Sequence, residues 1–171
     1  MRRPRRVTLD EDRANDVASA REAALALLER TRRTRADLRR RLRDKGYAEP
    51  AVASVLDRLA QVGLVDDADY ARAWLAGRWG RRMAGWRRLE ADLKRRGIAA
   101  EDIAAGRAAL EREQGGTDEL AGARRAIAQA DRRYAGLEPR VRRQRLYALL
   151  ARRGYDSDTI ERALRPARDL D

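Results

Sequence analysis

The fold is decided by one stretch of sequence, LRRRLRDKGY at residues 38–47, which returns as LEADLKRRGI at 89–98 and as LYALLARRGY at 146–155. Each copy has two leucines four positions apart, then a cation, a glycine and a tyrosine or isoleucine. A β-branched aliphatic residue follows five positions later in every copy. A fixed internal period is typical of an array of similar structural units, and the spacing of the copies leaves room for about three helices in each unit.

We therefore predict an all-α fold of three tandem three-helix repeats, similar to helix-turn-helix units, in an elongated and curved array. In each middle helix the two leucines lie on the buried face, and the glycine ends the helix in the left-handed conformation. The residue after the glycine, which is Tyr47, Ile98 or Tyr155, is expected to pack onto the core of its repeat. Base stacking by the two tyrosines is the alternative, but Ile98 cannot share that role.

The composition changes along the chain and suggests where the repeats begin and end. The first residues carry arginines and then carboxylates with few apolar side chains, which is typical of a flexible arm. The run Gln-Gly-Gly-Thr near the middle of the chain is typical of a linker. The predicted divisions are a flexible arm at 1–17, repeats at 18–62, 63–113 and 118–171, and a linker at 114–117.

The charge balance is strongly basic, with 40 lysines and arginines against 28 aspartates and glutamates, a formal net charge of +12. Such an excess attracts polyanions, either nucleic acid or an acidic protein surface. The chain has no cysteine and no histidine, which excludes disulfides, thiol nucleophiles, imidazole bases and the usual zinc ligand sets. No apolar run approaches the roughly 18 to 20 residues of a membrane span, so we expect a cytoplasmic protein that does not contact membranes.

Three-helix repeats with a turn before the last helix also suggest DNA readers, in which that last helix enters the major groove. Here the last helix of each repeat is acidic, as Glu101, Asp102 and Glu111 illustrate. A helix that approaches phosphates should not carry this many carboxylates. Base reading by the third helices is therefore disfavoured.

The cations concentrate instead on the middle helices and on the segments that lead into them. If the repeats stack in a like orientation, these side chains form one basic stripe that binds a partner. The alternative for any one cluster is a solvated helix face without a partner, but the threefold recurrence weighs against it for the whole set. The predicted contact residues are Arg39, Arg40, Arg43, Lys45, Arg81, Arg82, Arg87, Arg88, Lys94, Arg95, Arg142, Arg143, Arg145, Arg152 and Arg153.

Three tryptophans lie close together in the sequence of the second repeat. Trp74, Trp79 and Trp86 are spaced so that they cannot all lie on one helical face. Trp79 is flanked by arginines, and we predict that it is exposed and acts as an aromatic anchor at a protein interface.

Asp66, Asp67 and Asp69 at the start of the second repeat have two interpretations. They resemble the carboxylate cluster of an oxygen-ligand metal site or of a nuclease. Carboxylates at a helix start are also explained by capping and by the helix dipole, and no further acidic motif supplies the remaining ligands. We therefore expect no metal, no cofactor and no catalytic residue.

The run Gly-Leu-Val-Asp-Asp at 63–67, followed by Tyr70-Ala71, Gly85 and the Leu-x3-Leu-x2-cation-Gly-Ile phrase, resembles the RecX family, which modulates the RecA recombinase. The resemblance covers residues 20 to 166 and is most specific over 64–103. It implies a non-enzymatic protein that binds RecA, usually restraining filament growth, strand exchange and coprotease activity by occupying the filament groove or its growing end. The first repeat has Thr34 and Asp37 where the family more often has serine and glutamate, which keeps the capping chemistry.

The resemblance and the charge pattern together predict a monomeric regulator of the RecA filament in DNA repair and the SOS response. Contact with single- or double-stranded DNA stays open at this stage. The main rival is a sequence-tolerant nucleic-acid-binding protein that competes for single-stranded DNA, and a metal-dependent nuclease is a remote third. Competition for DNA should need near-saturating protein and should weaken steeply with salt, whereas a filament regulator can act at few molecules per filament.

Overall fold

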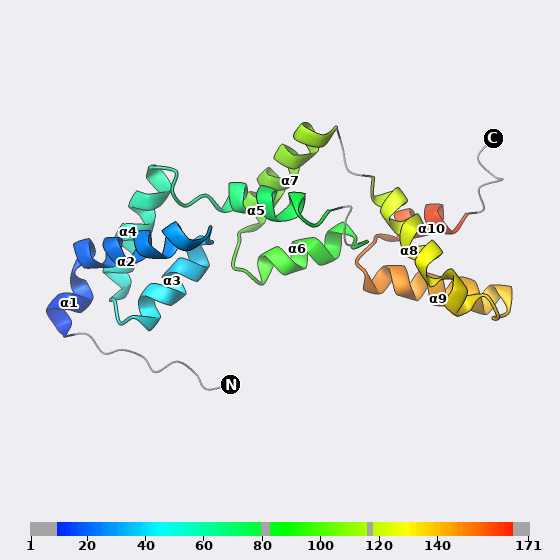
Figure 1. The fold of residues 1–171 in the computed structure, drawn as a ribbon, viewed down its shortest axis with the longest axis horizontal. Coiled ribbons are helices and arrows are strands. Elements are labelled where there is room, and N and C mark those ends of the chain that lie inside the picture. Colours follow the sequence, from blue (N-terminus) through cyan, green and yellow to red (C-terminus); the bar gives the residue numbers. More distant parts are fainter. Residues whose placement is uncertain (1–9, 80–82, 116–117, 166–171) are drawn as a thin grey trace. The chain divides into compact units, whose positions relative to one another are not determined.

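The computed structural model describes residues 10–79, 83–115 and 118–165, and these residues form helices with no strand among them (Figure 1). The prediction of an all-α fold is confirmed. The helices, in chain order through the described residues, are α1 (Glu11–Asn15), α2 (Val17–Arg30), α3 (Arg35–Asp44), α4 (Glu49–Gln61), α5 (Asp67–Ala76), α6 (Trp86–Lys94), α7 (Ala100–Gln114), α8 (Glu119–Tyr134), α9 (Pro139–Arg152) and α10 (Ser157–Leu164).

The short helix α1 lies where a flexible arm was predicted, so the expectation for residues 10–17 differs from the structure. Asp10 caps α1 by accepting the backbone N–H of Arg13, and Asp16 caps α2 by accepting that of Ala18. The carbonyl of Ala14 accepts the backbone N–H of Ala48 at 2.8 Å, which ties α1 to the start of α4. Acidic caps and one backbone contact thus order a segment that has too few apolar side chains to pack. Residues 1–9 of the predicted arm lie outside the described residues.

The first repeat, α2 to α4, packs its apolar faces into one core. The two leucines of its middle helix, Leu38 and Leu42, are fully buried, and small alanines of α2 let that helix approach closely. The core consists of Ala20, Ala24, Leu38, Leu42, Tyr47, Val52, Val55, Leu56, Leu59 and Val65.

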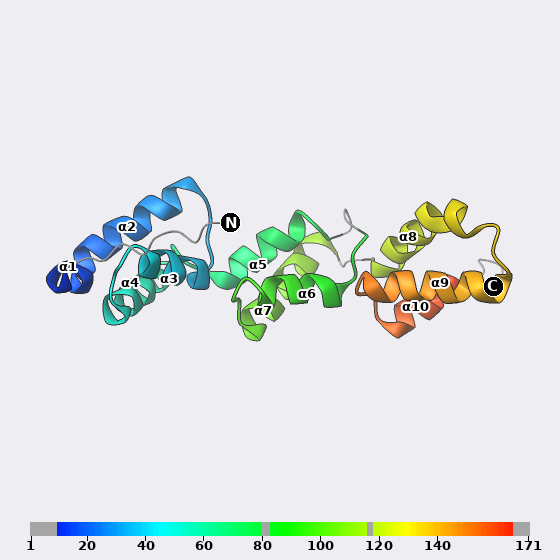
Figure 2. The same ribbon diagram turned by 90° about the horizontal axis from the view of Figure 1, so that it is seen from below.

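The third repeat, α8 to α10, packs into a core of its own, and its first helix contributes alanines as α2 does in the first repeat. Figure 2 shows α8, α9 and α10 packed together. Its core contains Ala123, Ala126, Leu150, Tyr155, Ile160 and Ala163. In the second repeat the leucines of the middle helix, Leu89 and Leu93, are likewise buried. The helical period of the repeated phrase therefore places the same two leucines inside every repeat.

The glycine after each middle helix adopts a positive φ, 100° at Gly46, 79° at Gly97 and 86° at Gly154. In the first and third repeats the residue after the glycine donates its backbone N–H to a carbonyl five residues earlier, at 3.2 Å in both cases. This pattern is the Schellman end of a helix, which brings the next side chain onto the core. Tyr47, Ile98 and Tyr155 are at most 8% exposed, so the prediction that they pack onto their repeats is confirmed.

The chain forms two compact units, Met1–Ala71 with Lys94–Gly106, and Arg72–Leu93 with Arg107–Asp171. The boundary between the first compact unit and the second compact unit crosses α5, α6 and α7. The middle repeat is therefore shared between the units, because one end of its helices packs with the first repeat and the other end with the third. The predicted boundaries group three consecutive helices into each repeat, whereas the two compact units divide the helices of the middle repeat. The predicted boundaries therefore stay a prediction.

Candidate partner-binding surface

The junction of the first two repeats joins the start of one middle helix to the glycine turn of the next, within the first compact unit. The hydroxyl of Thr34, the cap of α3, donates to the carbonyl of Arg96 at 3.1 Å. A Cβ added to Gly97 would lie 2.3 Å from the Cβ of Ala36. The close approach explains why this turn needs a residue without a side chain.

The junction of the second and third repeats has the same design, within the second compact unit. Gly85, just before α6, donates its backbone N–H to the carbonyl of Arg153 at 2.9 Å, and Arg87 donates to the carbonyl of Gly154 at 3.2 Å. A Cβ added to Gly85 would lie 2.3 Å from the backbone nitrogen of Tyr155. Backbone therefore packs directly on backbone at this junction.

A carboxylate of the following repeat caps the middle helix at each junction. Asp67 accepts the backbone N–H of Arg35 at 2.8 Å, and Glu119 accepts that of Trp86 at 2.6 Å. Burial raises the pKa of both carboxyls above their usual values. The prediction that Asp66, Asp67 and Asp69 stabilise their own helix start applies to Asp66, which accepts the N–H of Asp69 at 2.8 Å. Asp67 instead caps a helix of another repeat.

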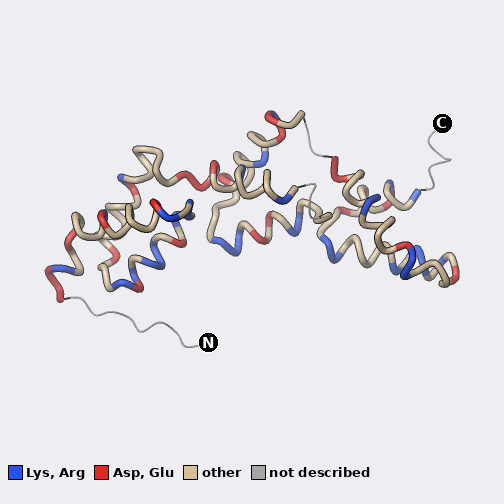
Figure 3. Tube along the Cα trace, in the orientation of Figure 1, with Lys and Arg blue, Asp and Glu red and all other residues tan. Residues whose placement is uncertain are grey.

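The predicted cations of α3 carry intramolecular ion pairs. Arg39 and Arg43 both pair with Glu49, and Arg40 pairs with Asp37. Lys45 is exposed and has no ion pair among the described residues. Figure 3 shows this run of basic positions along α3. The α3 cluster is thus a mixed surface in which acidic neighbours partly offset the arginines.

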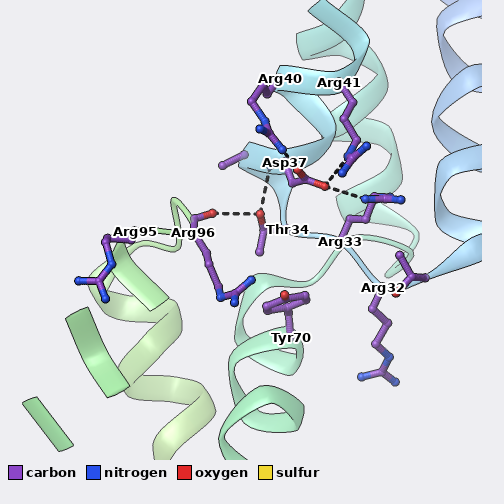
Figure 4. A pocket seen from close by; sticks show the side chains of 11 residues that line it. Arg32, Arg33, Thr34, Asp37, Arg40, Arg41, Tyr70, Arg95 and Arg96 are labelled. Atoms are coloured by element: carbon purple, nitrogen blue, oxygen red, sulfur yellow. Dashed lines mark hydrogen bonds and ion pairs between the residues drawn. The ribbon is translucent and has the colours of Figure 1, made fainter. Parts of the chain in front are cut away.

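Arg40 also lines a cavity of about 660 Å³ in the first compact unit, together with Arg95 from the end of α6. The lining holds six arginines and a single carboxylate, that of Asp37 (Figure 4). Of these arginines the sequence analysis named Arg40 and Arg95. The arginines of this cavity are Arg32, Arg33, Arg40, Arg41, Arg95 and Arg96.

Asp37 is the point on which three of these guanidinium groups converge. Arg33 donates to it at 2.9 Å and Arg41 at 2.7 Å, and Arg40 bonds its other oxygen. Burial alone would raise the pKa of Asp37, but the hydrogen bonds from Arg41, Arg40 and Arg33 lower it to about 2. The carboxylate therefore stays charged and holds the arginines in place around the cavity.

Arg32, Arg33, Arg41 and Arg96 are not among the predicted contact residues. The signal available was the run Thr-Arg-Arg-Thr at 31–34, which places cations directly before a helix cap. Nothing in the local sequence indicates that Arg95 and Arg96 of the next repeat lie beside this run.

In the second compact unit the predicted cations fall into two groups. On α9, Arg142 pairs with Asp131 and Arg143 with Glu161. The remaining cations have no ion pair among the described residues; Arg153 is partly buried and the others are exposed. These remaining cations are Arg87, Arg88, Arg145, Arg152 and Arg153.

The junction of the second and third repeats brings the predicted arginines at the start of α6 close to those at the end of α9. Arg87 and Arg88 at the start of α6 lie against the Arg153-Gly154 turn, as their backbone contacts require. Arg81 and Arg82 lie outside the described residues. Lys94 is exposed at the end of α6 and belongs to the first compact unit. In both units, therefore, a junction gathers arginines from two successive repeats.

Trp79 is buried, with 8% of its surface exposed, and this corrects the prediction of an exposed anchor. Its ring stacks on that of Trp86, with the ring centroids 5.2 Å apart. The guanidinium of Arg107 from α7 lies over both rings, 5.1 Å and 4.3 Å from their centroids. The arginines flanking Trp79 in sequence suggested that it is exposed. In the structure, however, Arg107 of α7 lies over its ring.

Two kinds of feature are absent from the part of the chain that the structure describes. No helix there is long and apolar enough to cross a membrane. No group of three or more potential metal-ligating side chains occurs among those residues either.

Comparison with known proteins decides the family. Sequence profiles of the first, second and third three-helix domains of RecX match residues 20–59, 66–106 and 117–164. The regulatory protein RecX of Thermobifida fusca (strain YX) is 37% identical over 148 residues, covering 86% of this chain and 78% of that protein. The chain belongs to the RecX family. The resemblance inferred from the sequence and the fold of three three-helix repeats are both confirmed.

Other RecX proteins agree in sequence and in fold. The regulatory protein RecX of Mycobacterium leprae (strain Br4923) is 41% identical over 145 residues, which is 82% of this chain and 81% of that protein. A crystal structure of RecX from Lactobacillus salivarius superimposes with a TM-score of 0.77 at 18% identity, covering 86% of this chain and 94% of the other. At that identity the superposition shows the RecX fold alone.

Proposed function

We propose that this member of the RecX family binds RecA and RecA–DNA filaments and restrains their recombinase, ATPase and coprotease activities in DNA repair and the SOS response. It acts in the cytoplasm as a monomer, and as a binding protein rather than an enzyme. The relatives named regulatory protein RecX support a regulatory role.

The gathering of arginines at both repeat junctions is the observation that carries the proposal. In the second compact unit, Arg87 and Arg88 are exposed and have no ion pair among the described residues. Guanidinium groups without intramolecular partners bind carboxylates and phosphates of another molecule without first breaking an internal ion pair. A RecA–DNA filament offers both groups.

The first experiment is a titration of the chain into RecA while single-stranded-DNA-dependent ATP hydrolysis is followed at moderate salt. Loss of hydrolysis at far fewer than one molecule per RecA monomer is the expected result. Loss that occurs only when the chain coats the DNA, and that weakens steeply with added salt, would instead identify a competitor for single-stranded DNA. That rival function is favoured only by the net charge of +12.

Charge reversal then tests the junction arginines. The double variant Arg87→Glu and Arg88→Glu should need about tenfold more protein for the same inhibition, which corresponds to about 1.4 kcal/mol of filament affinity. Glutamates suit the first turn of α6 because of the helix dipole, so the fold should persist. The matched control reverses Arg124 and Arg132, which are exposed on α8 outside the predicted set. Equal loss in both double variants would contradict a specific contact and indicate net charge alone.

A further inference from the structure

The arginine-lined cavity of the first compact unit adjoins a second and smaller cavity of different chemistry. The second cavity, of about 220 Å³, shares Arg32, Arg33 and Tyr70 with the first. The two cavities are therefore neighbours along one surface, and a ligand only a few residues long would reach both.

The larger cavity is suited to anionic groups. Six arginines line it with one carboxylate, that of Asp37, and Arg32 also pairs with Asp69 of the smaller cavity at 2.6 Å. In Figure 4 the guanidinium groups of Arg33, Arg40 and Arg41 converge on Asp37, and the ring of Tyr70 lies near the side chain of Arg96. Carboxylates of a partner would form charge-assisted hydrogen bonds with the guanidinium groups that line this cavity.

The smaller cavity is suited to an aliphatic side chain. Leu28 and Leu64 form its apolar part, and Leu64 is 54% exposed, although it is a large apolar residue. The charged part of the lining includes the ion pair of Arg32 and Asp69. Leu28 is partly buried against the core of the first repeat. An apolar side chain that entered this cavity would cover Leu64, with a favourable transfer free energy.

We propose that these two cavities form one binding site for a short acidic peptide segment of a partner protein, in which an aliphatic residue follows a run of carboxylates. The carboxylates lie among the arginines of the larger cavity. The aliphatic side chain enters the smaller cavity beside Leu64. The partner is a protein with an exposed acidic segment.

Nucleic acid fits the site less well, because its phosphates recur evenly along the strand. A strand passing from the larger cavity into the smaller one would meet the carboxylates of Asp66 and Asp69 and an exposed leucine. A peptide can place a neutral apolar residue there instead. The alternation of charged and apolar surface therefore favours a peptide.

The test measures fluorescence anisotropy of a fluorescein-labelled peptide, Gly-Asp-Glu-Asp-Leu-Gly, titrated with the whole chain in the absence of RecA. Saturable binding is expected, and replacing the peptide leucine with serine should weaken it about fivefold. Because RecA is absent, failure here is separate from failure of the filament assay.

Two pairs of variants locate the site. Arg40→Ser and Leu64→Ser should each weaken peptide binding about tenfold. Their controls are Arg39→Ser, an exposed and ion-paired neighbour on α3 that does not line the larger cavity, and Val62→Ser, 53% exposed but outside the smaller one. Both controls should change the Kd less than about twofold. Circular dichroism of all four variants checks that the helices persist.

Three results would overturn the proposal. The first is equal affinity for the leucine and serine peptides, which would reduce the site to charge attraction. The second is equal weakening by Val62→Ser and Leu64→Ser. The third is displacement of the peptide by a short oligothymidylate whose own binding also depends on Leu64, which would identify a nucleic-acid site.

Discussion

The carboxylate of Asp67, the first residue of α5, accepts the backbone N–H of Arg35, the first residue of α3, at 2.8 Å. Glu119, the first residue of α8, makes the equivalent bond to Trp86, the first residue of α6, at 2.6 Å. The first backbone N–H groups of a helix have no partner inside it. Asp67 therefore adds a second acceptor to the start of α3, where Thr34 already accepts the backbone N–H of Asp37, and Glu119 supplies an acceptor at the start of α6.

The middle helix of the third repeat, α9, is capped by a residue next to it in sequence. Glu138 accepts the backbone N–H groups of Arg140 and Val141, and Pro139 occupies the first helical position, where no N–H is needed.

Removal of a cap that comes from another repeat should destabilise the second compact unit. Glu119→Ala is expected to lower the free energy of unfolding by about 1 kcal/mol, and Glu119→Gln should lower it less because the amide oxygen still accepts the bond. Urea unfolding followed by circular dichroism measures both. The control is Glu113→Ala, which removes only an exposed ion pair with Arg72. Equal losses for the alanine variants at 113 and 119 would contradict the capping role.

The pKa of Asp37 predicts a specific dependence of stability on pH. Because the pKa is lowered from 3.8 to about 2 in the folded chain, its contribution is present above about pH 4 and is lost as the pH falls toward 2. After discounting for solvent screening of this partly exposed carboxylate, the lowered pKa corresponds to about 1 kcal/mol. Asp37→Asn should therefore be less stable than the wild type by about that amount at neutral pH, and the difference should vanish near pH 2. Unfolding curves across this range measure it, and a constant difference would show that Asp37 acts without its charge.

The close backbone contact at Gly85 predicts a severe effect of one methyl group. In Gly85→Ala the new Cβ would lie 2.3 to 2.4 Å from backbone atoms of Gly154 and Tyr155, which cannot move independently. We expect a loss of about 3 kcal/mol in the free energy of unfolding. Gly136→Ala is the matched control, since nothing lies within 4 Å of a Cβ added there. Similar stability of the two variants would mean that the α6–α9 junction is not formed.

Because Trp79 is buried, we predict that its replacement lowers the stability of the fold rather than only the binding of a partner. Trp79→Ala should lower the free energy of unfolding by about 3 to 5 kcal/mol, because it removes the stack on Trp86 and the contact with Arg107. Thermal unfolding measures this effect. A variant of wild-type stability that has lost only filament binding would restore the exposed-anchor interpretation.

The repeated phrase contained enough local information to predict the helices and their ends. Leu38 and Leu42 were expected inside because their spacing matches one face of a helix, and Gly46 was expected to end it because few other residues adopt its φ. The same reasoning placed Tyr47 on the core. For Trp79 the local pattern was misleading, because residues next to it in sequence do not reveal which distant helix covers it.

The repeats, their buried leucines and the family were predictable from local patterns, because helical period, glycine turns and motif spacing are properties of short stretches of the chain. Three relations appear only in the folded chain: Asp67 caps α3, Arg107 covers Trp79, and arginines of two repeats line one cavity. These relations join residues that are far apart in sequence. They depend on how successive repeats pack, and the free energy of that packing is distributed over contacts that no short pattern encodes.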